Sequence, residues 1–415
     1  MEKTMSGKVK WFSSENFGAP ELTNDWGRLT TLLDAVLVTG YGAQDVESIT
    51  VENNIMAVNF ARNHNIQQYQ WVELSGTNTD LDGEHKVLAV TPTSIELIAE
   101  LQDQTITGAI SCKIASMGWT KPFSGENKGV YQAKDTITNP FFLRVDDSYQ
   151  GQGISTGAKF GRVGILESCT DIDDISGAQV PYDATNPTKN WIDTATYKGW
   201  SKWYYATSVS SIDTNANDNG TPSDGVRRWV IVGNKDSFWF LPSIMVEASN
   251  STAWQTCFAL GFGVTQKRDI YYPFLSSRTN YVAVTSSGRL TSGLPFNNNL
   301  ISGVNFLKNP DGIVAPTEGR VQISGTTSAS TFSGTNVYAV ESDGSILFSS
   351  MRAIGSQSPY AYLGDYPIIK EVYTSLASRL YNEIIEEGGR VYLIKKCPMS
   401  TAYQGGYMFD LGEIL

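Results

Sequence analysis

The segment Gly153–Gly157 reads Gly-Ile-Ser-Thr-Gly and matches the G-x-S-x-G pattern that presents a nucleophilic serine in many hydrolases. That chemistry needs a hydrophobic strand before the serine, a helix after it and a histidine base. Here a Gly/Gln stretch precedes the motif and a predicted strand follows it. The two histidines, His64 and His85, both come earlier in the chain. We therefore interpret Ser155 as a turn residue.

Five aspartates could supply the paired carboxylates that glycoside hydrolases use. Asp146 and Asp147 form one group, and Asp171, Asp173 and Asp174 form the other. Catalysis would need carboxylates from separate strands on opposite sides of the scissile bond, a placement that sequence does not give. Aspartates beside serine and glycine are typical of loops. We expect no catalytic residue among them.

Two polar segments resemble parts of a calcium-binding loop. Asp213, Asn215 and Asn217 alternate as calcium ligands do, but the sixth position is Asp218 instead of glycine, and the bidentate glutamate is absent. The segment Asn78–Gly83 fits the first half of the same pattern and then runs into a predicted strand. A polar loop and a glycine-containing turn account for them better than a metal does.

Cysteine spacing argues against a metal centre or a disulfide framework. The four cysteines, Cys112, Cys169, Cys257 and Cys397, are far apart and form no C-x-x-C pair, so we expect reduced, buried thiols. The sequence has no Walker A motif, no HExxH and no dinucleotide-binding fingerprint. We therefore predict no catalytic residue, no metal and no cofactor.

The composition is that of a β-rich, turn-rich protein. Of 415 residues, 38 are glycine and 20 are tyrosine, and only 18% are charged. The formal net charge of −11 would repel a phosphate backbone, and no basic cluster offsets it. No apolar run reaches the length of a membrane span, and the first residues lack the apolar core of a signal peptide. We expect a soluble protein without a membrane span.

The first structural element that the sequence predicts is an aromatic β-hairpin. In Arg228–Leu241 two apolar runs flank a Gly-Asn-Lys-Asp turn, which predicts a β-hairpin with both faces covered. The segment Trp200–Tyr205 could pair with it. The interpretation as a structural core competes with an exposed aromatic platform for sugars, and we favour the core.

One amphipathic helix is predicted near the N-terminus. Its apolar positions are Leu29, Leu32, Leu33, Val36 and Leu37. We expect Asn24 or Asp25 to cap its start and Gly40 or Gly42 to end it. A second, partial helical pattern (Ile369, Val372, Leu376, Leu380 and Ile384) predicts one or two short C-terminal helices.

The remaining pattern is mainly β, so the predicted fold is a multi-domain β-sandwich or barrel with one N-terminal amphipathic helix. We divide the chain into an extended N-terminal arm (1–22), a helix plus small β-barrel or sandwich domain (23–116) and a larger β-sandwich-like domain (117–415). Candidate strands in the small domain are Ser48–Val51, Ile55–Phe60, Tyr69–Leu74, Lys86–Val90 and Ser94–Ile98. Those in the larger domain are Phe141–Val145, Lys159–Glu167, Asn280–Thr285, Asn336–Val340, Gly389–Ile394 and Tyr407–Leu411. Ile212–Gly225 is a long polar loop without core residues.

The N-terminus resembles the opening strand of a cold-shock domain, SGKVKWF followed by Phe17-Gly18. In that family, lysine and aromatic side chains on adjacent strands stack single-stranded bases. The match ends within about a dozen residues, where Ala19–Leu22 and then a helix follow. We regard it as coincidental and predict no nucleic-acid binding.

A longer series of segments resembles a family of tailed-bacteriophage virion structural proteins. These segments are VKWFSSENFGAPEL with the following helix, WVELSGTNTDLDGEHKVLAV, Gly118–Gly125, FFLRVDDS, WVIVGNKDSFWF and the C-terminal strand before Asp-Leu-Gly. The resemblance implies a non-enzymatic tail or collar component, a tail ring or sheath-like assembly, made in the bacterial cytoplasm and located in the virion tail. It implies contacts with other copies, six or twelve in a ring, and with portal-proximal tail proteins. The C-terminus departs from the aromatic ending of the family.

Two alternatives stay open at this point. One is a receptor- or glycan-binding tail protein that contacts the host surface, with weak hydrolase activity. The other concerns residues 1–22, which either reach an adjacent chain or the tail tube, or cover their own β domain.

Overall fold

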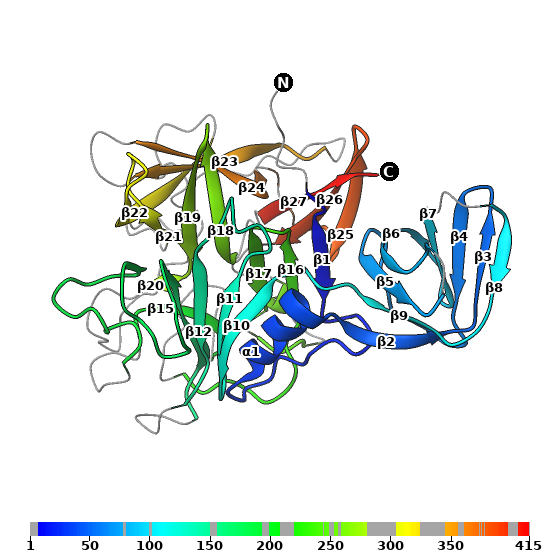
Figure 1. Ribbon diagram of the computed structural model, residues 1–415, viewed down its shortest axis with the longest axis horizontal. Helices are drawn as coiled ribbons and strands as arrows, with labels where there is room; N and C mark the ends of the chain where they lie inside the picture. Colours follow the sequence, from blue (N-terminus) through cyan, green and yellow to red (C-terminus); the bar gives the residue numbers. More distant parts are fainter. Residues whose placement is uncertain are drawn as a thin grey trace.

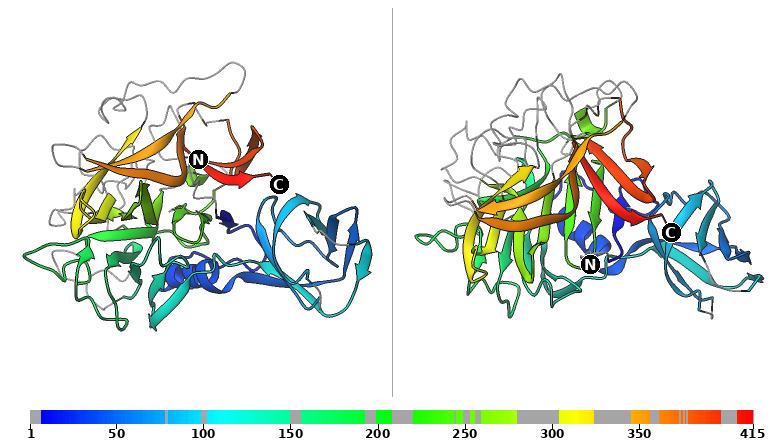
Figure 2. Two further views of the ribbon diagram at one scale, coloured as in Figure 1. Left: turned by 45° about the horizontal axis from the view of Figure 1, so that its top comes forward. Right: turned by 90° about the horizontal axis from the view of Figure 1, so that it is seen from above.

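The computed structural model describes residues 7–77, 80–98, 102–149, 156–192, 199–207, 220–243, 245–248, 253–255, 259–279, 304–323, 345–355, 361–372, 374, 376, 378–396 and 406–414. The fold is mainly β, as the composition predicts. A small β unit (residues 41–114) projects from one side of a large β unit that holds the rest of the described chain (Figure 1). The C-terminal strands of the large unit face the small unit (Figure 2).

The small β unit is one curled antiparallel sheet. Among the described residues it has eight strands, in the order β2 (Tyr41–Val46), β9 (Ile110–Ile114), β5 (Trp71–Ser75), β6 (Gly83–Val90), β7 (Ser94–Ile98), β4 (Ile55–Asn59), β3 (Ser48–Glu52) and β8 (Gln104–Ile106).

The large β unit contains two sheets. The first, with twelve described strands, has the order β1 (Lys10–Ser13), β16 (Trp229–Gly233), β17 (Phe238–Pro242), β18 (Leu260–Lys267), β19 (Ile270–Ser276), β21 (Val304–Lys308), β22 (Val314–Ile323), β23 (Phe348–Gly355), β24 (Tyr362–Val372), β27 (Gly406–Glu413), β26 (Arg390–Lys396) and β25 (Glu383–Glu387). The second, with seven described strands, is β10 (Thr120–Gly125), β11 (Lys128–Gln132), β12 (Phe142–Asp146), β13 (Lys159–Leu166), β15 (Ser201–Ala206) and β20 (Arg278–Thr279), with β14 (Gln179–Val180) beside β13. The twelve-stranded sheet curls until β18 also pairs with β24, at Gln266 and Asp365.

The predicted aromatic hairpin forms as β16 and β17, and both of its faces are buried. Trp229, like Phe238 and Phe240, packs in the core shared with the helix and the seven-stranded sheet. Trp239, like Val230, packs in a second core inside the curl of the twelve-stranded sheet. Because successive strand residues point to opposite faces, a continuously apolar hairpin can separate two cores. The structure confirms the interpretation of this hairpin as core.

The expectation that Trp200–Tyr205 pairs with this hairpin is wrong. Strand β15 pairs with β13 and β20 in the seven-stranded sheet. It meets the hairpin face to face instead, with the Trp203 ring 5.8 Å from that of Phe238. The aromatic composition therefore indicated contact, but layer packing, not strand pairing, provides it.

The predicted helix forms as α1 (Arg28–Leu33) and continues as a π-helical turn, η1 (Asp34–Thr39), to Gly40. All five apolar positions of the pattern are buried. Gly161 of β13 lets the helix approach closely, because a Cβ there would lie 2.7 Å from Leu29. A further short helix among the described residues is the 3₁₀ turn η2 (Ala253–Gln255).

The predicted cap of this helix is wrong. Neither Asn24 nor Asp25 caps it, since the N-cap is Gly27 with φ of 85° and no side-chain cap. Instead the carboxylate of Asp147, distant in sequence, accepts the backbone N–H of Leu29 at 2.9 Å. A tertiary contact has replaced the local capping side chain.

Among the described residues of this segment, the predicted short C-terminal helices are also not observed. Ile369 and Val372 lie in β24, Ile384 lies in β25, and Leu380 is 73% exposed between them. Pairing of β24 with β23 and β27 buries Ile369 and Val372 without a helix, so tertiary packing overrides the partial helical spacing.

The structure places the remaining predicted segments, two strands, the polar loop and the N-terminal arm, as follows. Candidate strands Asn280–Thr285 and Asn336–Val340 lie outside the described residues, as do residues 212–219 of the polar loop. Within the arm 1–22, Lys10–Ser13 form β1, paired with β16 of the same chain. That matches the alternative in which the arm covers its own β domain. A further contact with a neighbour stays a prediction.

Candidate functional site

The serine and the calcium-like loop singled out from sequence cannot be placed. Ser155, and Asp213 through Asn217, lie outside the described residues. So does Asn78, but Asp82 of the same segment is described, and its carboxylate accepts hydrogen bonds from the backbone N–H and hydroxyl of Thr77 at 2.9 and 2.7 Å. These hydrogen bonds tie Asp82, just before β6, back to Thr77, so its carboxylate serves a local structural contact.

The structure brings some of the aspartates together, through arginines. The guanidinium of Arg144 lies 3.2 Å from Asp173 and 3.9 Å from Asp146, and Arg162 lies 3.2 Å from Asp146. A hydrogen bond from Lys128 lowers the pKa of Asp173, which Arg144 lowers further. A general acid needs a raised pKa, so this environment is opposite to that of a hydrolase acid.

The other two loop aspartates also stabilise local turns. Asp174 accepts hydrogen bonds from Ser176 and Thr170, and these hold the pKa of its carboxyl below its usual range. Asp171 accepts the backbone N–H of Asp173 at 2.8 Å. Within the described residues, these contacts account for the group as loop residues.

Asp147 has the raised pKa that a general acid needs, but its side chain is not accessible to a substrate. Burial raises its pKa to about 8, against hydrogen bonds from Tyr205 and Leu29 that favour the charged form. It has no exposed surface. Because a substrate cannot reach it, its role is to cap α1.

In the described part of the chain, histidine and cysteine side chains do not come together in a catalytic or metal-binding site. His64 is buried in the small β unit, where burial lowers its pKa and its ring accepts the N–H of Ile66 at 2.9 Å. Cys112 is a buried free thiol with a pKa raised to about 12 by burial, and Cys169 is also free. No group of three metal-ligating side chains occurs among these residues.

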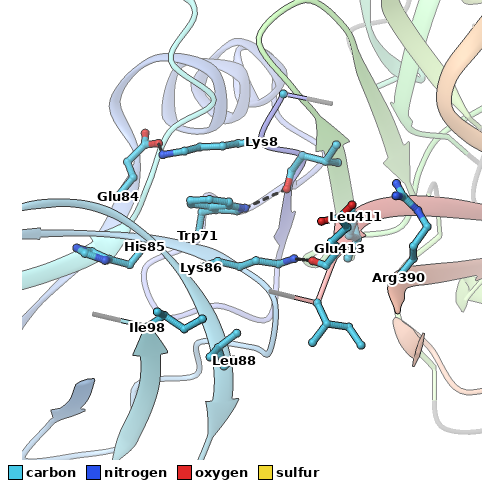
Figure 3. Close-up of a pocket in the computed structure, with 14 residues that line it drawn as sticks. Lys8, Trp71, Glu84, His85, Lys86, Leu88, Ile98, Arg390, Leu411 and Glu413 are labelled. Carbon is cyan, nitrogen blue, oxygen red and sulfur yellow. Dashed lines mark hydrogen bonds and ion pairs between the residues drawn. The ribbon is translucent and has the colours of Figure 1, made fainter. Parts of the chain in front are cut away.

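A cleft of about 400 Å³ lies between the two β units, at the seam of β5 and β6 with β27 (Figure 3). We refer to it as the seam cleft. Its lining is mixed, with an indole, apolar side chains and charges of both signs, from residues Gly7, Lys8, Val9, Trp71, Glu84, His85, Lys86, Leu88, Ile98, Arg390, Leu411, Gly412, Glu413 and Ile414. The volume lies in the range of small-ligand sites, roughly 300–1,000 Å³.

Trp71 lies at the centre of the seam cleft (Figure 3). Its indole N–H donates to the carbonyl of Val9 at 3.1 Å, which fixes the ring across the seam. The ammonium group of Lys8 lies 4.5 Å from the ring centroid. Lys8 also pairs with Glu84 at 3.4 Å, and Glu84 is bound more closely by the buried Lys10 at 2.6 Å. The carboxylate of Glu84 is therefore already neutralised.

Two further cations line the opposite side. The ammonium of Lys86 donates to the backbone carbonyl of Glu413. Burial lowers the pKa of Lys86, and the nearby charge of Arg390 lowers it further. Arg390 itself forms a bidentate pair with Asp410, with its shortest contact at 2.8 Å. The carboxylates of Glu413 and Asp410 act on Lys86 in the opposite direction and raise its pKa, so each of the two cations has an acidic group near it.

The residues of this cleft carry no recognisable motif in the sequence. Trp71 and Lys86 are neighbours across β5 and β6, but Arg390 follows Lys86 by more than three hundred residues. The alternation of β6 could have indicated that Glu84 and Lys86 share a face. It could not have shown which element covers that face.

The comparisons with known proteins give no identity. No family model matches this chain, and no curated protein matches it. Among the described residues, no helix is long and apolar enough to cross a membrane.

Proposed function

We propose that this chain is a non-enzymatic structural component of a tailed-bacteriophage particle, located in its tail and present in six or twelve copies. The observation that carries the proposal is the role of the resembling segments. They become β1, β5, β6, β12, β16 and β17, whose side chains build the cores and the seam. Because the resembling segments are core strands, the resemblance concerns the structural framework and not a binding or catalytic site.

The fate of the candidate catalytic groups supports the same proposal. Every described aspartate of the two candidate groups is engaged by a cation, a backbone N–H or a hydroxyl. The purified protein is therefore expected to show no glycosidase or esterase turnover. Turnover that disappears in Asp173→Asn or Ser155→Ala would contradict this part of the proposal.

A surface for neighbouring copies is suggested by the small β unit. Ile55 of β4 and Ile98 of β7 are direct cross-strand partners, and each is 40% exposed. Adjacent exposed apolar side chains are suited to a contact surface, and here Ile98 also borders the seam cleft. Such a face on each copy can bind a different face of the next copy and close a ring.

The test is incorporation into particles. Mass spectrometry of purified particles should give a copy number of six or twelve. The double variant Ile55→Asp/Ile98→Asp should fold but be depleted from particles, whereas Thr93→Asp, in an exposed turn of the same unit, should be incorporated normally. Absence of the wild-type chain from particles would overturn the proposal.

The alternative of a receptor- or glycan-binding tail protein is favoured by a different observation, the seam cleft. Its combination of an indole with several polar and charged side chains is suited to a small polar ligand.

A further inference from the structure

The two outermost strands of the twelve-stranded sheet, β1 and β25, are held together by side chains. The amide nitrogen of Asn382, just before β25, donates to the hydroxyl of Ser13 at 3.3 Å and to the carboxylate of Glu15 at 2.8 Å. Its amide oxygen accepts a hydrogen bond from the ammonium of Lys395 on β26 at 2.7 Å. Asn382, Ser13 and Lys395 are buried. We refer to these hydrogen bonds as the closing contact, because they close the curl of the sheet where the described residues form no backbone ladder between β1 and β25.

Glu371 of β24 lies in the same row of residues as the lysine of the closing contact. It is the direct cross-strand partner of Tyr407 on β27, and Tyr407 is in turn the partner of Lys395 on β26. Directly paired residues of adjacent strands point to the same face of a sheet. All three side chains therefore point into the curl, where Tyr407 packs in the second core.

Glu371 is a buried carboxyl group without a partner. Its side chain has no exposed surface, and neither of its oxygens accepts a hydrogen bond within the described part of the chain. Buried polar groups are normally hydrogen-bonded, and an ionised carboxylate is especially costly to bury unpaired. The closed curl therefore favours the protonated form of this side chain.

The charged side chain that shares the row with Glu371 is Lys395. In the other direction Glu371 pairs with Ser349 of β23, which carries no charge. Glu15 contacts the row through Asn382. The titratable members of the core inside the curl are tyrosines, namely Tyr69, Tyr272, Tyr366 and Tyr407. A cation for an ionised Glu371 would thus come from the closing contact.

An ionised Glu371 can be stabilised in two ways. Lys395 can turn toward it and leave Asn382, or the strands that cover it can separate and admit water. The first removes the lysine from the closing contact. The second should begin at the closing contact, because side chains alone hold the curl there and local opening occurs where few hydrogen bonds must break.

We infer that loss of the Glu371 proton opens the curl at the closing contact, so that β25 and β26 separate from β1 while the rest of the fold stays formed. The connection between the N-terminal strand and the C-terminal strands is then sensitive to pH. This inference does not rest on the proposed function, so either can fail without the other.

The direction of the pH effect follows from the two states of the carboxyl group. In the closed curl, burial raises the pKa of Glu371 from 4.5 to about 8. In the opened state the group is hydrated and has its ordinary pKa. Between these two values the opened state has lost a proton that the closed state keeps, so opening becomes easier as pH rises from about 4.5 to about 8.

The experiment is hydrogen exchange of the full chain, followed by mass spectrometry at pH 5 and at pH 8. Wild type and Glu371→Gln are compared at the same pH, so the intrinsic pH dependence of amide exchange cancels. At pH 8, peptides from β25 and β26 should exchange at least about tenfold faster in the wild type, the equivalent of one pKa unit. At pH 5 the two proteins should exchange alike, and peptides from β3, β4 and β16 should exchange alike at both pH values.

Two kinds of variant serve as controls. Glu387→Gln removes an exposed carboxylate from β25 itself and should exchange as the wild type does. Asn382→Ala removes the closing contact, so its β25 and β26 peptides should exchange rapidly already at pH 5. Ser13→Ala, which removes only the longest of the three hydrogen bonds, takes its place if Asn382→Ala does not fold, and should show a smaller change in the same direction.

Three results would overturn the inference. The first is equal exchange of β25 and β26 in wild type and Glu371→Gln at pH 8. The second is faster exchange of the wild type that extends equally to β3, β4 and β16, which would indicate loss of overall stability without local opening. The third is unchanged exchange at pH 5 in the variant that removes the closing contact. None of these results bears on particle incorporation, which tests the proposed function separately.

Discussion

The side-chain amides of Asn16 and Gln70 form a reciprocal pair of hydrogen bonds, at 2.7 and 2.9 Å, in the buried seam between the two β units. Gln70 also donates to the carbonyl of Trp11, and Trp71 donates to that of Val9. Side chains of the small β unit thereby satisfy backbone carbonyls on the outer edge of β1. An edge strand covered in this way is not open to pairing with another chain.

This amide pair should be energetically coupled. Asn16→Ala and Gln70→Ala each leave a buried amide without its partner, so each should cost about 1–3 kcal/mol of unfolding free energy. The two effects should be non-additive by about 0.5–3 kcal/mol, because the residues share one network. Urea denaturation of both single variants and the double variant measures this. Asn24→Ala, at an exposed pair with Asp224, should change stability little, and additive costs at the seam would contradict the coupling.

Truncation at the N-terminus should have two distinct outcomes. Deleting residues 1–16 removes β1, including the buried Trp11 and Phe12, and should abolish cooperative unfolding. Deleting residues 2–6 leaves β1 and the amide pair in place and should keep the wild-type melting temperature within a few degrees. The shorter deletion is therefore the one suited to asking whether the N-terminus aids assembly. A stable, cooperatively folded 1–16 deletion would show that β1 is dispensable.

The two tryptophans of the hairpin should be equally important, one for each core. Trp229 donates to the carbonyl of Pro20 at 2.8 Å, and Trp239 stacks on Phe274 with ring centroids 5.1 Å apart. Either Trp→Ala change should cost about 3–5 kcal/mol by chemical denaturation. Phe17→Ala, at a side chain that is 47% exposed, is the control. Wild-type stability of either tryptophan variant would refute the two-core description.

Glu371 should make stability fall as pH rises. Its carboxylate is fully buried on β24, with no hydrogen-bond partner among the described residues, and burial raises its pKa from 4.5 to about 8. Between these values the folded state holds a proton that the unfolded state has lost, so stability decreases from about pH 4.5 to about pH 8. Asp147, with a pKa raised to about 8, contributes in the same direction.

The variant Glu371→Gln removes the contribution of Glu371 to this pH dependence while keeping the shape of the side chain. It should match the wild type near pH 4 and be more stable at pH 8, by at least about 1.4 kcal/mol, the equivalent of one pKa unit. Glu387→Gln, at an exposed position on β25, provides the control. Parallel stability curves for wild type and Glu371→Gln from pH 4 to pH 8 would show that Glu371 does not titrate as described.

The sequence by itself determined those features that depend on neighbouring residues. Side chains alternate across a strand and recur every three to four residues along a helix, so the burial of Trp229, Trp239 and Leu29 follows from local pattern. The mainly β class follows from composition and strand spacing in the same way. The partial helical spacing around Ile369 was misleading because the same apolar residues are equally compatible with buried strands.

Only the tertiary structure decided which distant groups meet. Asp147 replaces a local helix cap, Arg144 joins Asp146 to Asp173, and Lys86 donates to the carbonyl of Glu413 at the seam cleft. Each depends on how separate sheets are layered, and the free energy that fixes the layering comes from apolar area buried between them, which is non-directional. A local pattern specifies which face of a strand is buried. It does not specify which other element buries it.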